Sequence, residues 1–289
     1  MIRQTNNNIL VPTDFSEVAD CALKHAIAVA KAYKNEITLM YIVEDGFLGG
    51  IFSKSQSEIM KDAIVTKLNV KAQEIERETG IKVTTRAESG KVYKTIAEIA
   101  NSEKYDSIIM GSHGASGLEQ IVGSNASRTI QYAEVPVVVV KSTSLGSEGY
   151  KKIVMPFDLT IESKQKLEWG INIAQKFNSE IHIVYSKSDD EYLDLKMKAN
   201  IAQVKHTLED HKVKFVMYEF NDSVLDNFAN EIHNYANIIN ADLIVAMTHT
   251  EKGISEMIIG TLTQQLVNRA NNVAVMCIHP KETAFNYDY

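Results

Sequence analysis

The sequence predicts an α/β protein made of two tandem open parallel sheets, each with five strands and with helices on both faces. Three observations support this. The chain has 289 residues, which suits two ordinary domains. A short apolar run ending in Pro-x-Asp occurs at 9–14 and again at 153–158. Apolar runs alternate with helical patterns in both halves, as in the βαβ units of Rossmann-like folds. We expect domains at 1–145 and 150–280, followed by a tail at 281–289.

Ten strands are predicted, and they are continuous apolar runs rather than alternating patterns. Such runs are typical of a parallel sheet covered on both faces. The first helix carries an apolar stripe from Ala19 to Ala30, and a second stripe from Leu167 to Phe177 repeats it. A small, polar linker puts the domain boundary near Gly146. The strands are expected at 8–12, 37–43, 82–88, 107–111 and 135–140, and at 152–156, 181–186, 213–219, 242–247 and 273–278.

The two halves differ most after their second strands, where the first half inserts residues 46–58. This insertion contains three glycines together with Phe47 and Phe52. Two interpretations stay open for it. It forms a lid or a partner contact, or it is a variable surface loop.

Composition excludes several classes of protein. Hydrophobic residues make up 45% of the chain and charged residues 23%, and the net charge of −7 does not favour nucleic acid or an anionic membrane as a partner. Cys21 and Cys277 are far apart and form no metal-binding or disulfide pattern. The polar start of the chain lacks the apolar core of a signal peptide, and no apolar run reaches the ~20 residues of a membrane span. We therefore expect a cytoplasmic protein.

The segment after the fourth strand, residues 111–127, is the most informative stretch. In open parallel sheets, ligands bind beyond the carboxyl ends of the strands. Glycines let the backbone approach a ligand closely, and a helix start offers unpaired N–H groups to an anion. The segment therefore predicts a phosphate site, with the Ser124 hydroxyl as an added donor. Alternatively, its glycines only make turns and Ser124 only caps a helix. The residues concerned are Gly111, Gly114, Gly117, Gly123, Ser124 and Asn125.

Polar side chains elsewhere at this edge allow two interpretations. Asp14 can accept hydrogen bonds from a ribose or a base, or it can cap the first helix together with Ser16. His113 and His249 occupy equivalent positions, and His113 can contact phosphate. No Ser/His/Asp arrangement surrounds either histidine, so catalysis is not expected. Lys91 lies outside any Walker pattern, which leaves fast ATP hydrolysis without its usual residues.

Two motifs resemble the universal stress protein family, in its ATP-binding branch. They are VPTDFS after the first strand and GSHG, eight residues and GS after the fourth. The resemblance implies ATP or AMP as the ligand, with Mg²⁺ accompanying ATP. It implies that phosphates and ribose contact the glycine-rich loop, while the first strand's end flanks adenine and sugar and Ile42 lies at the adenine edge. The full predicted site is Pro12, Thr13, Asp14, Ile42, Gly111, His113, Gly114, Gly123, Ser124 and Asn125.

This chain departs from the family pattern in both halves. The family loop has nine residues between its second and third glycines, whereas eight separate Gly114 from Gly123. In the second half the spacing is nine, but Met247 and Thr250 replace the first two glycines, so we interpret this loop as degenerate. The resemblance also implies that the two domains pair through their last strands, and it leaves a homodimer open.

The function expected from the sequence is non-catalytic binding of an adenine nucleotide by the first domain, in a cytoplasmic stress response. The alternative is an interaction and dimerisation module that does not use nucleotide, with both loops vestigial. A slow nucleotide hydrolase is the third candidate.

Overall fold

The computed structural model describes residues 6–44, 54–112, 123–141, 145–146, 148–160, 162–220, 228–248, 260–269 and 272–280. The first half contains β1 (Asn8–Pro12), α1 (Glu17–Tyr33), β2 (Glu36–Glu44), α2 (Lys54–Thr79), β3 (Val83–Gly90), α3 (Val92–Ser102), β4 (Ser107–Gly111), α4 (Ser124–Tyr132) and β5 (Val137–Val140). The second half contains β6 (Lys152–Pro156), α5 (Glu162–Phe177), β7 (Glu180–Ser186), α6 (Glu191–Asp210), β8 (Lys214–Phe220), α7 (Phe228–Ile238), β9 (Leu243–Met247), α8 (Thr261–Arg269) and β10 (Ala274–Ile278).

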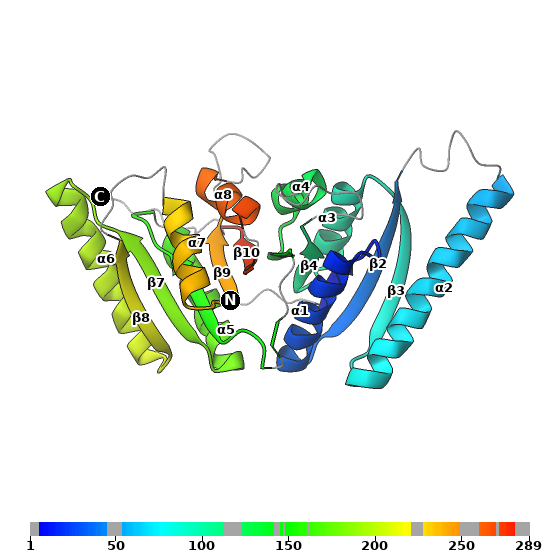
Figure 1. Ribbon diagram of the computed structural model, residues 1–289, viewed down its shortest axis with the longest axis horizontal. Helices are drawn as coiled ribbons and strands as arrows, with labels where there is room; N and C mark the ends of the chain where they lie inside the picture. Colours follow the sequence, from blue (N-terminus) through cyan, green and yellow to red (C-terminus); the bar gives the residue numbers. More distant parts are fainter. Residues whose placement is uncertain are drawn as a thin grey trace.

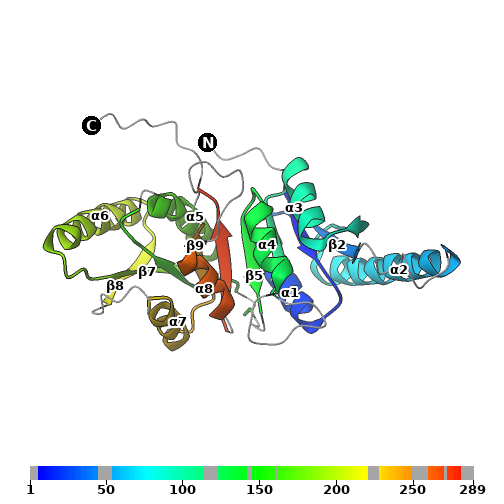
Figure 2. The ribbon, with the colours of Figure 1, turned by 90° about the horizontal axis from the view of Figure 1, so that it is seen from above.

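The ten strands form one continuous sheet in the order β3-β2-β1-β4-β5-β10-β9-β6-β7-β8. The order within each half is the same, and all neighbours within a half run parallel. The halves join where β5 and β10 pair antiparallel, with Val275 opposite Val139. Figure 2 looks down on this pair, with α4 and α8 beside it. The two predicted five-stranded sheets are therefore present, but they are joined edge to edge.

Helices cover both faces of the sheet, as predicted, and each face has its own apolar core. Helices α1, α2, α5 and α6 pack on one face, and α3, α4, α7 and α8 pack on the other. The spread of the helices along the strongly twisted sheet can be followed in Figure 1. The interiors of the central strands are almost completely buried, with Ile9, Ile109, Ile153 and Val245 each at 0% exposure, whereas the edge strands β3 and β8 are only partly buried. This explains why the central strands are continuous apolar runs and why β3, a predicted strand, is largely polar.

Side-chain contacts reinforce the junction between the halves. The Tyr33 hydroxyl at the end of α1 donates to the Asn172 side chain in α5 at 2.7 Å, and the Tyr33 ring packs against Phe177. On the other face, the buried Lys141 ammonium that follows β5 donates to the Asn268 carbonyl of α8 at 2.7 Å. The two halves therefore share an ordered interface on both faces of the sheet.

The predicted strand bounds agree with the structure to within two residues at either end. The insertion at 46–58 needs a correction, because α2 already begins at Lys54 and its backbone includes 54–58. A helix anchored by the buried Leu68 and Ala72 can extend toward its amino end, because adding a residue to an existing helix costs little. Residues 45–53 lie outside the described part of the chain, so the rest of that prediction stays open. Among the described helices, none is long and apolar enough to cross a membrane.

The linker glycines provide a test of how firmly the halves are joined. Gly149 has φ +74, and a Cβ placed there would lie 2.3 Å from the Phe177 ring, whereas a Cβ on Gly146 would meet nothing within 4 Å. We expect Gly149→Ala to lower the free energy of unfolding by about 2–4 kcal/mol, from left-handed strain and overpacking together. Gly146→Ala is the matched control and should change stability by less than about 0.5 kcal/mol. Urea denaturation measures both, and equal effects would contradict this explanation.

Candidate functional site

The candidate site lies where the strand order reverses, between β1 and β4. These strands are neighbours, with Ile9 opposite Ser107, but their chains continue to opposite sides of the sheet. Thr13 donates its N–H to the Met40 carbonyl at 2.8 Å, and Ser112 donates to the Val140 carbonyl at 2.8 Å. The sheet's hydrogen bonding thus extends one residue past each strand. It brings the predicted segments Pro12–Asp14 and Gly111–Ser112 to one edge of the sheet at the switch point, which is the usual ligand position in open α/β sheets.

Helix α4 presents its amino end at the same edge. Gly123 is the N-cap residue, with extended backbone (φ −57, ψ 147), and Ser124 is the first helical residue. The Gly123 N–H donates to the Ser112 carbonyl at 2.8 Å, which ties the helix start to the end of β4. The following N–H groups, from Ser124 to Ala126, have no partner within the helix, because a helix leaves its first turn of donors unsatisfied. The structure therefore corrects the alternative in which Ser124 is itself the cap.

The turn between β1 and α1 gives Asp14 a structural role. Its Oδ1 accepts the Ser16 N–H at 3.0 Å, and the Ser16 hydroxyl oxygen accepts the Ala19 N–H at 3.2 Å as the N-cap of α1. Phe15 has φ +63, which is unusual for a bulky residue, and its ring stacks on Tyr41 with a centroid distance of 5.4 Å. Asp14 thus supports the helix cap, as one of the two interpretations predicted. Its contact with a sugar stays a prediction.

Gly111 has a packing role that the sequence did not reveal. A Cβ at this position would lie 3.0 Å from Cγ1 of Val18 and 3.3 Å from the Val18 carbonyl carbon. The first turn of α1 therefore approaches β4 so closely that a side chain at residue 111 would fit only if α1 shifted slightly. The helix accounts for this glycine without a ligand, so its proposed contact with phosphate needs separate support.

The remaining predicted residues are placed as follows. Ile42 is partly buried and packs against the core beneath α3 and α4, as does Val92 in the first turn of α3. Asn125 is partly buried in the first turn of α4, whereas Ser124 is exposed. His113 and Gly114 lie outside the described residues, so their roles stay predictions. Among the described residues, the ends of β1 and β4, the start of α4 and the apolar side chain of Ile42 therefore lie at the same edge of the sheet.

The second half differs at each corresponding position. Met247 ends β9 where Gly111 ends β4, and its side chain is buried in the core under α5. The Thr263 hydroxyl in the first turn of α8 donates to the Met247 carbonyl at 2.6 Å. Ala126 stands at the corresponding place in α4. In the second half, the Met247 side chain therefore occupies the space at the switch point, and the Thr263 hydroxyl bonds α8 to the end of β9.

A buried ionic cluster also distinguishes this half. Lys166 takes the place that Ala22 has in α1, and its ammonium donates to the Ser163 hydroxyl at 3.3 Å and lies 4.9 Å from the Phe157 ring centre. Burial lowers the pKa of Lys166 to about 8, against the opposing effect of the Asp158 charge. Burial also disfavours the Asp158 carboxylate, but hydrogen bonds from Ser163 and Thr160 outweigh it and lower the pKa of Asp158. The Ser163 hydroxyl thus links the two charged groups, since it donates to Asp158 and accepts from Lys166.

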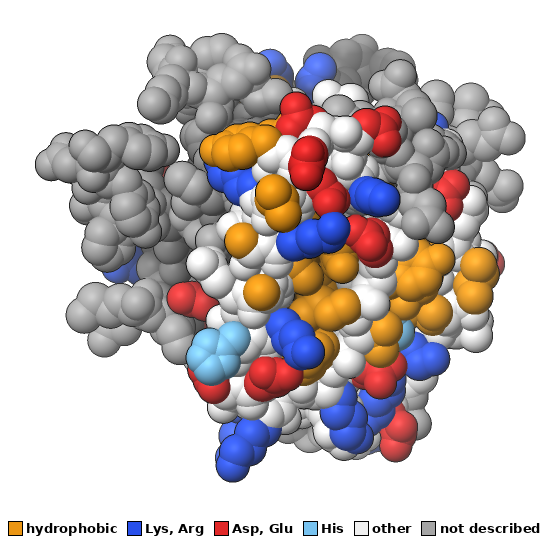
Figure 3. Space-filling model, turned by 90° about the vertical axis from the view of Figure 1, so that its left-hand side faces the viewer, with side chains coloured by type: hydrophobic (Ala, Val, Ile, Leu, Met, Phe, Trp, Pro, Cys, Tyr) orange, Lys and Arg blue, Asp and Glu red, His pale blue; other side chains and the backbone are white. Residues whose placement is uncertain are grey.

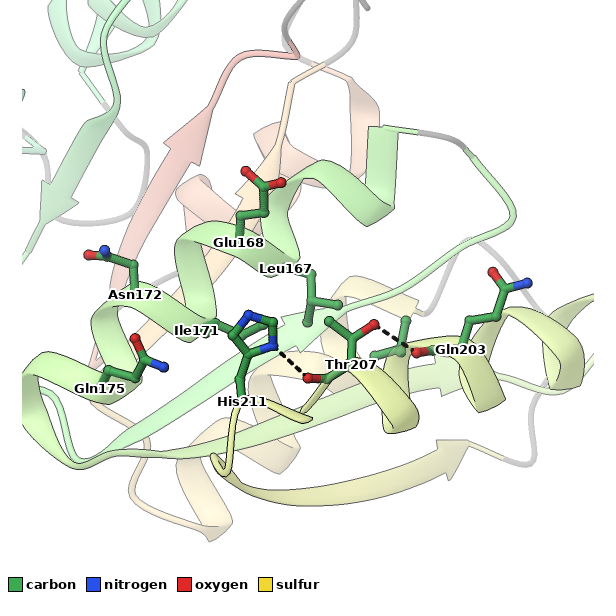
Figure 4. A pocket seen from close by; sticks show the side chains of 9 residues that line it. Leu167, Glu168, Ile171, Asn172, Gln175, Gln203, Thr207 and His211 are labelled. Carbon is green, nitrogen blue, oxygen red and sulfur yellow. Dashed lines mark hydrogen bonds between the residues drawn. The ribbon is translucent and has the colours of Figure 1, made fainter. Parts of the chain in front are cut away.

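A shallow groove between α5 and α6, about 470 Å³ in volume, lies away from both switch points. Figure 4 shows Leu167 and Ile171 at its floor and amide side chains at its rim. The Thr207 hydroxyl donates to the Gln203 carbonyl and the His211 ring contacts the Thr207 carbonyl, so these groups bond within α6 itself. The outer face nearby, in Figure 3, carries apolar patches separated by charged side chains. In the described residues, no group of three or more His, Cys, Asp or Glu could hold a metal ion.

A duplicated open α/β sheet with a helix amino end at its switch point defines the doubly wound class of α/β protein. The profile of the universal stress protein family matches residues 5–141 and again 149–279. The chain therefore belongs to this family and contains two of its domains in tandem.

Similar proteins agree with this assignment. A universal stress protein of Methanocaldococcus jannaschii is 37% identical over 138 residues, which cover 46% of this chain and 81% of that protein. A second one from the same organism is 34% identical over 151 residues, covering 46% and 93%. The crystal structure of a universal stress protein from Archaeoglobus fulgidus superposes with a TM-score of 0.77, over 95% of this chain and 99% of that one. At 21% identity this last likeness concerns the fold alone.

The Lys166 cluster predicts a pH dependence of stability. Its folded pKa of about 8 lies below its ordinary value of 10.5, so the folded state binds this proton more weakly than the unfolded chain does. Below pH 8 Lys166 is protonated in both states, and burying its charge lowers the free energy of unfolding by about 3 kcal/mol. Above pH 10.5 the group is neutral in both states, and this cost is absent. We expect Lys166→Met to be more stable than wild type at pH 7–8, with the difference shrinking as the pH rises to 10.5. Denaturant unfolding over this range measures it, and a pH-independent difference would argue against the assignment.

Proposed function

We propose that the first half binds an adenine nucleotide, ATP or AMP, and that the protein acts without catalysis in a cytoplasmic stress response. One observation carries the proposal. The amino end of α4 is held against the end of β4 by the 2.8 Å bond from Gly123 to Ser112, at the edge of the sheet that the Pro12–Asp14 turn also borders. Backbone N–H groups and the helix dipole converge there on one place, which is how α/β proteins bind phosphate.

The residues of this edge fit such a ligand. Gly123 has no side chain at the N-cap, and the exposed Ser124 hydroxyl stands beside the N–H groups of the first turn. Ile42 and Val92 offer an apolar surface for a base near the same edge. Helix α4 has no acidic residue in its first turn to repel an anion. If ATP binds with Mg²⁺, the ion supplies charge neutralisation for the phosphates.

The second half supports a division of labour between the domains. With Met247 buried at the end of β9 and Thr263 bonded to its carbonyl, the switch point lacks the glycine that ends β4 in the first half. We infer that this half does not bind nucleotide and serves as the structural partner of the first.

Two other functions compete with this proposal. In an interaction module both loops are vestigial, and the loop one residue shorter than the family pattern favours that explanation. A slow hydrolase needs a base close to the phosphates. Among the described residues beside the start of α4, Asp14 is the candidate base, and it is engaged in the α1 cap. A nucleotide titration distinguishes the interaction module from a nucleotide-binding protein, and a turnover measurement distinguishes the hydrolase.

Location and assembly belong to the same proposal. Cys21 and Cys277 are both free thiols, as is common in the reducing cytoplasm. Helix α6 exposes Tyr192 at 71% and Leu195 at 61%, which gives two chains an apolar surface through which to form a homodimer. Sedimentation at several protein concentrations tests the dimer.

Equilibrium titration with ATP and AMP tests the binding site. We expect saturable binding by the wild type and at least a tenfold loss of affinity in Gly123→Val, because a branched side chain at the N-cap blocks approach to the N–H groups of α4. Valine tolerates the extended backbone of Gly123, so the variant should fold.

The matched control is Gly260→Val at the start of α8, the corresponding position of the second half. It should leave affinity unchanged. Equal weak binding by all three proteins would refute the phosphate site and favour the interaction module. A loss confined to Gly260→Val would move the site to the second half.

Turnover separates a binding protein from an enzyme. We expect release of inorganic phosphate from ATP far below about 1 per second, the lower end of ordinary enzyme rates, because no Walker lysine supports the reaction. A steady rate above that value, abolished by Gly123→Val, would overturn the non-catalytic assignment.

A further inference from the structure

Arg128 lies on the same face of α4 as Ser124, one turn farther along. Residues four apart in a helix are neighbours, and long side chains point back toward the helix amino end. The side chain is exposed, and its guanidinium carbon lies 5.1 Å from the centre of the Tyr93 ring in α3. Among the residues that the structure describes, no carboxylate is within ion-pair distance of Arg128. This cation therefore rests on an aromatic face beside the candidate phosphate site.

Tyr93 belongs to the edge at which the nucleotide would lie. It follows Val92, which packs in the same core as Ile42. The Tyr93 ring also contacts Tyr132 at the end of α4, with ring centroids 5.4 Å apart. The stack thus places the Arg128 guanidinium between α3 and α4, one helical turn beyond Ser124 on the same face of α4.

The second half lacks both members of this pair. Gln265 is the fifth residue of α8, as Arg128 is of α4, and Ala229 is the second residue of α7, as Tyr93 is of α3. The cation and its aromatic support are therefore present only in the half whose fourth strand ends in glycine. If Arg128 and Tyr93 served packing alone, there would be no reason for them to occur in the same half as Gly111.

We propose that Arg128 binds the phosphates beyond the first one of the bound nucleotide and makes the site selective for ATP over AMP. This inference rests on the nucleotide binding proposed above. In this proposal the N–H groups at the start of α4 bind the phosphate nearest the helix. The Arg128 guanidinium, one turn along the same face, binds the phosphates that follow it. An arginine that is itself exposed can leave a weak stack on a half-buried ring for a charge-assisted, bidentate bond to phosphate. AMP has no second phosphate and gains nothing from it.

Titration of Arg128→Gln with ATP and AMP, at constant Mg²⁺ and ionic strength, tests the inference. Glutamine is the residue that the second half carries, and the position is exposed, so folding is preserved. We expect ATP affinity to fall roughly tenfold to a hundredfold and AMP affinity to change less than about twofold. Arg128→Lys keeps the charge but loses the planar set of N–H donors of the guanidinium. Its ATP affinity should lie between those of the wild type and Arg128→Gln.

Lys94→Gln is the control for general electrostatic attraction. It removes one exposed positive charge from α3, next to Tyr93, where Lys94 pairs with Glu98 at 3.7 Å. It should change ATP affinity less than about threefold. Equal losses for ATP and AMP in Arg128→Gln, or an equal loss in Lys94→Gln, would overturn the role of Arg128 while leaving nucleotide binding intact. Failure of the wild type to bind either nucleotide would instead overturn the proposed function and this inference with it.

Discussion

The antiparallel pairing of β5 with β10 is the contact on which the rest of this architecture depends. Without it, each half would expose an apolar edge strand, Val137–Val140 or Ala274–Ile278, with a row of unpaired backbone groups. Paired, both strands are buried and neither edge is open. The bond from Lys141 to the Asn268 carbonyl and the Tyr33–Asn172 contact then fix how the helices of the halves meet. Each switch point therefore forms within one body.

Much of the fold could be predicted because its signals are local. Strands buried on both faces must be apolar throughout, so residues 107–111 and 243–247 are recognisable from their own composition. The start of α4 was equally local, since Gly123-Ser124 marks a helix beginning. The role of Gly111 was not local. Its need for glycine arises from Val18, 93 residues earlier in the chain, and a single sequence does not reveal such a contact. The burial of Lys166 was not predictable either, because a lysine in a helix is ordinarily exposed and its own sequence neighbourhood gives no sign of burial.

Glycine at a ligand site and glycine at a helix contact look identical in a sequence. At the end of β4 the close approach of α1 leaves little room for a side chain, and at the end of β9 a methionine fills the corresponding space. The replacement of glycine by Met247 thus reflects a different spacing between helix and strand as well as any change in ligand binding. The difference between the halves is consequently distributed over packing, the Thr263 bond and the Lys166 cluster, and does not reside in the loop alone.

The covalent link across the β5–β10 pair has an evolutionary consequence. When two identical subunits meet through such an edge, every substitution appears in both sites at once, and a change that damages binding damages it twice. Fusion into one chain removes this restriction. The two copies can then differ at corresponding positions, as they do where one has Gln265 and Ala229 and the other has Arg128 and Tyr93. The partner copy is also supplied at a fixed local concentration whatever the expression level, so the edge strands stay paired when the protein is scarce.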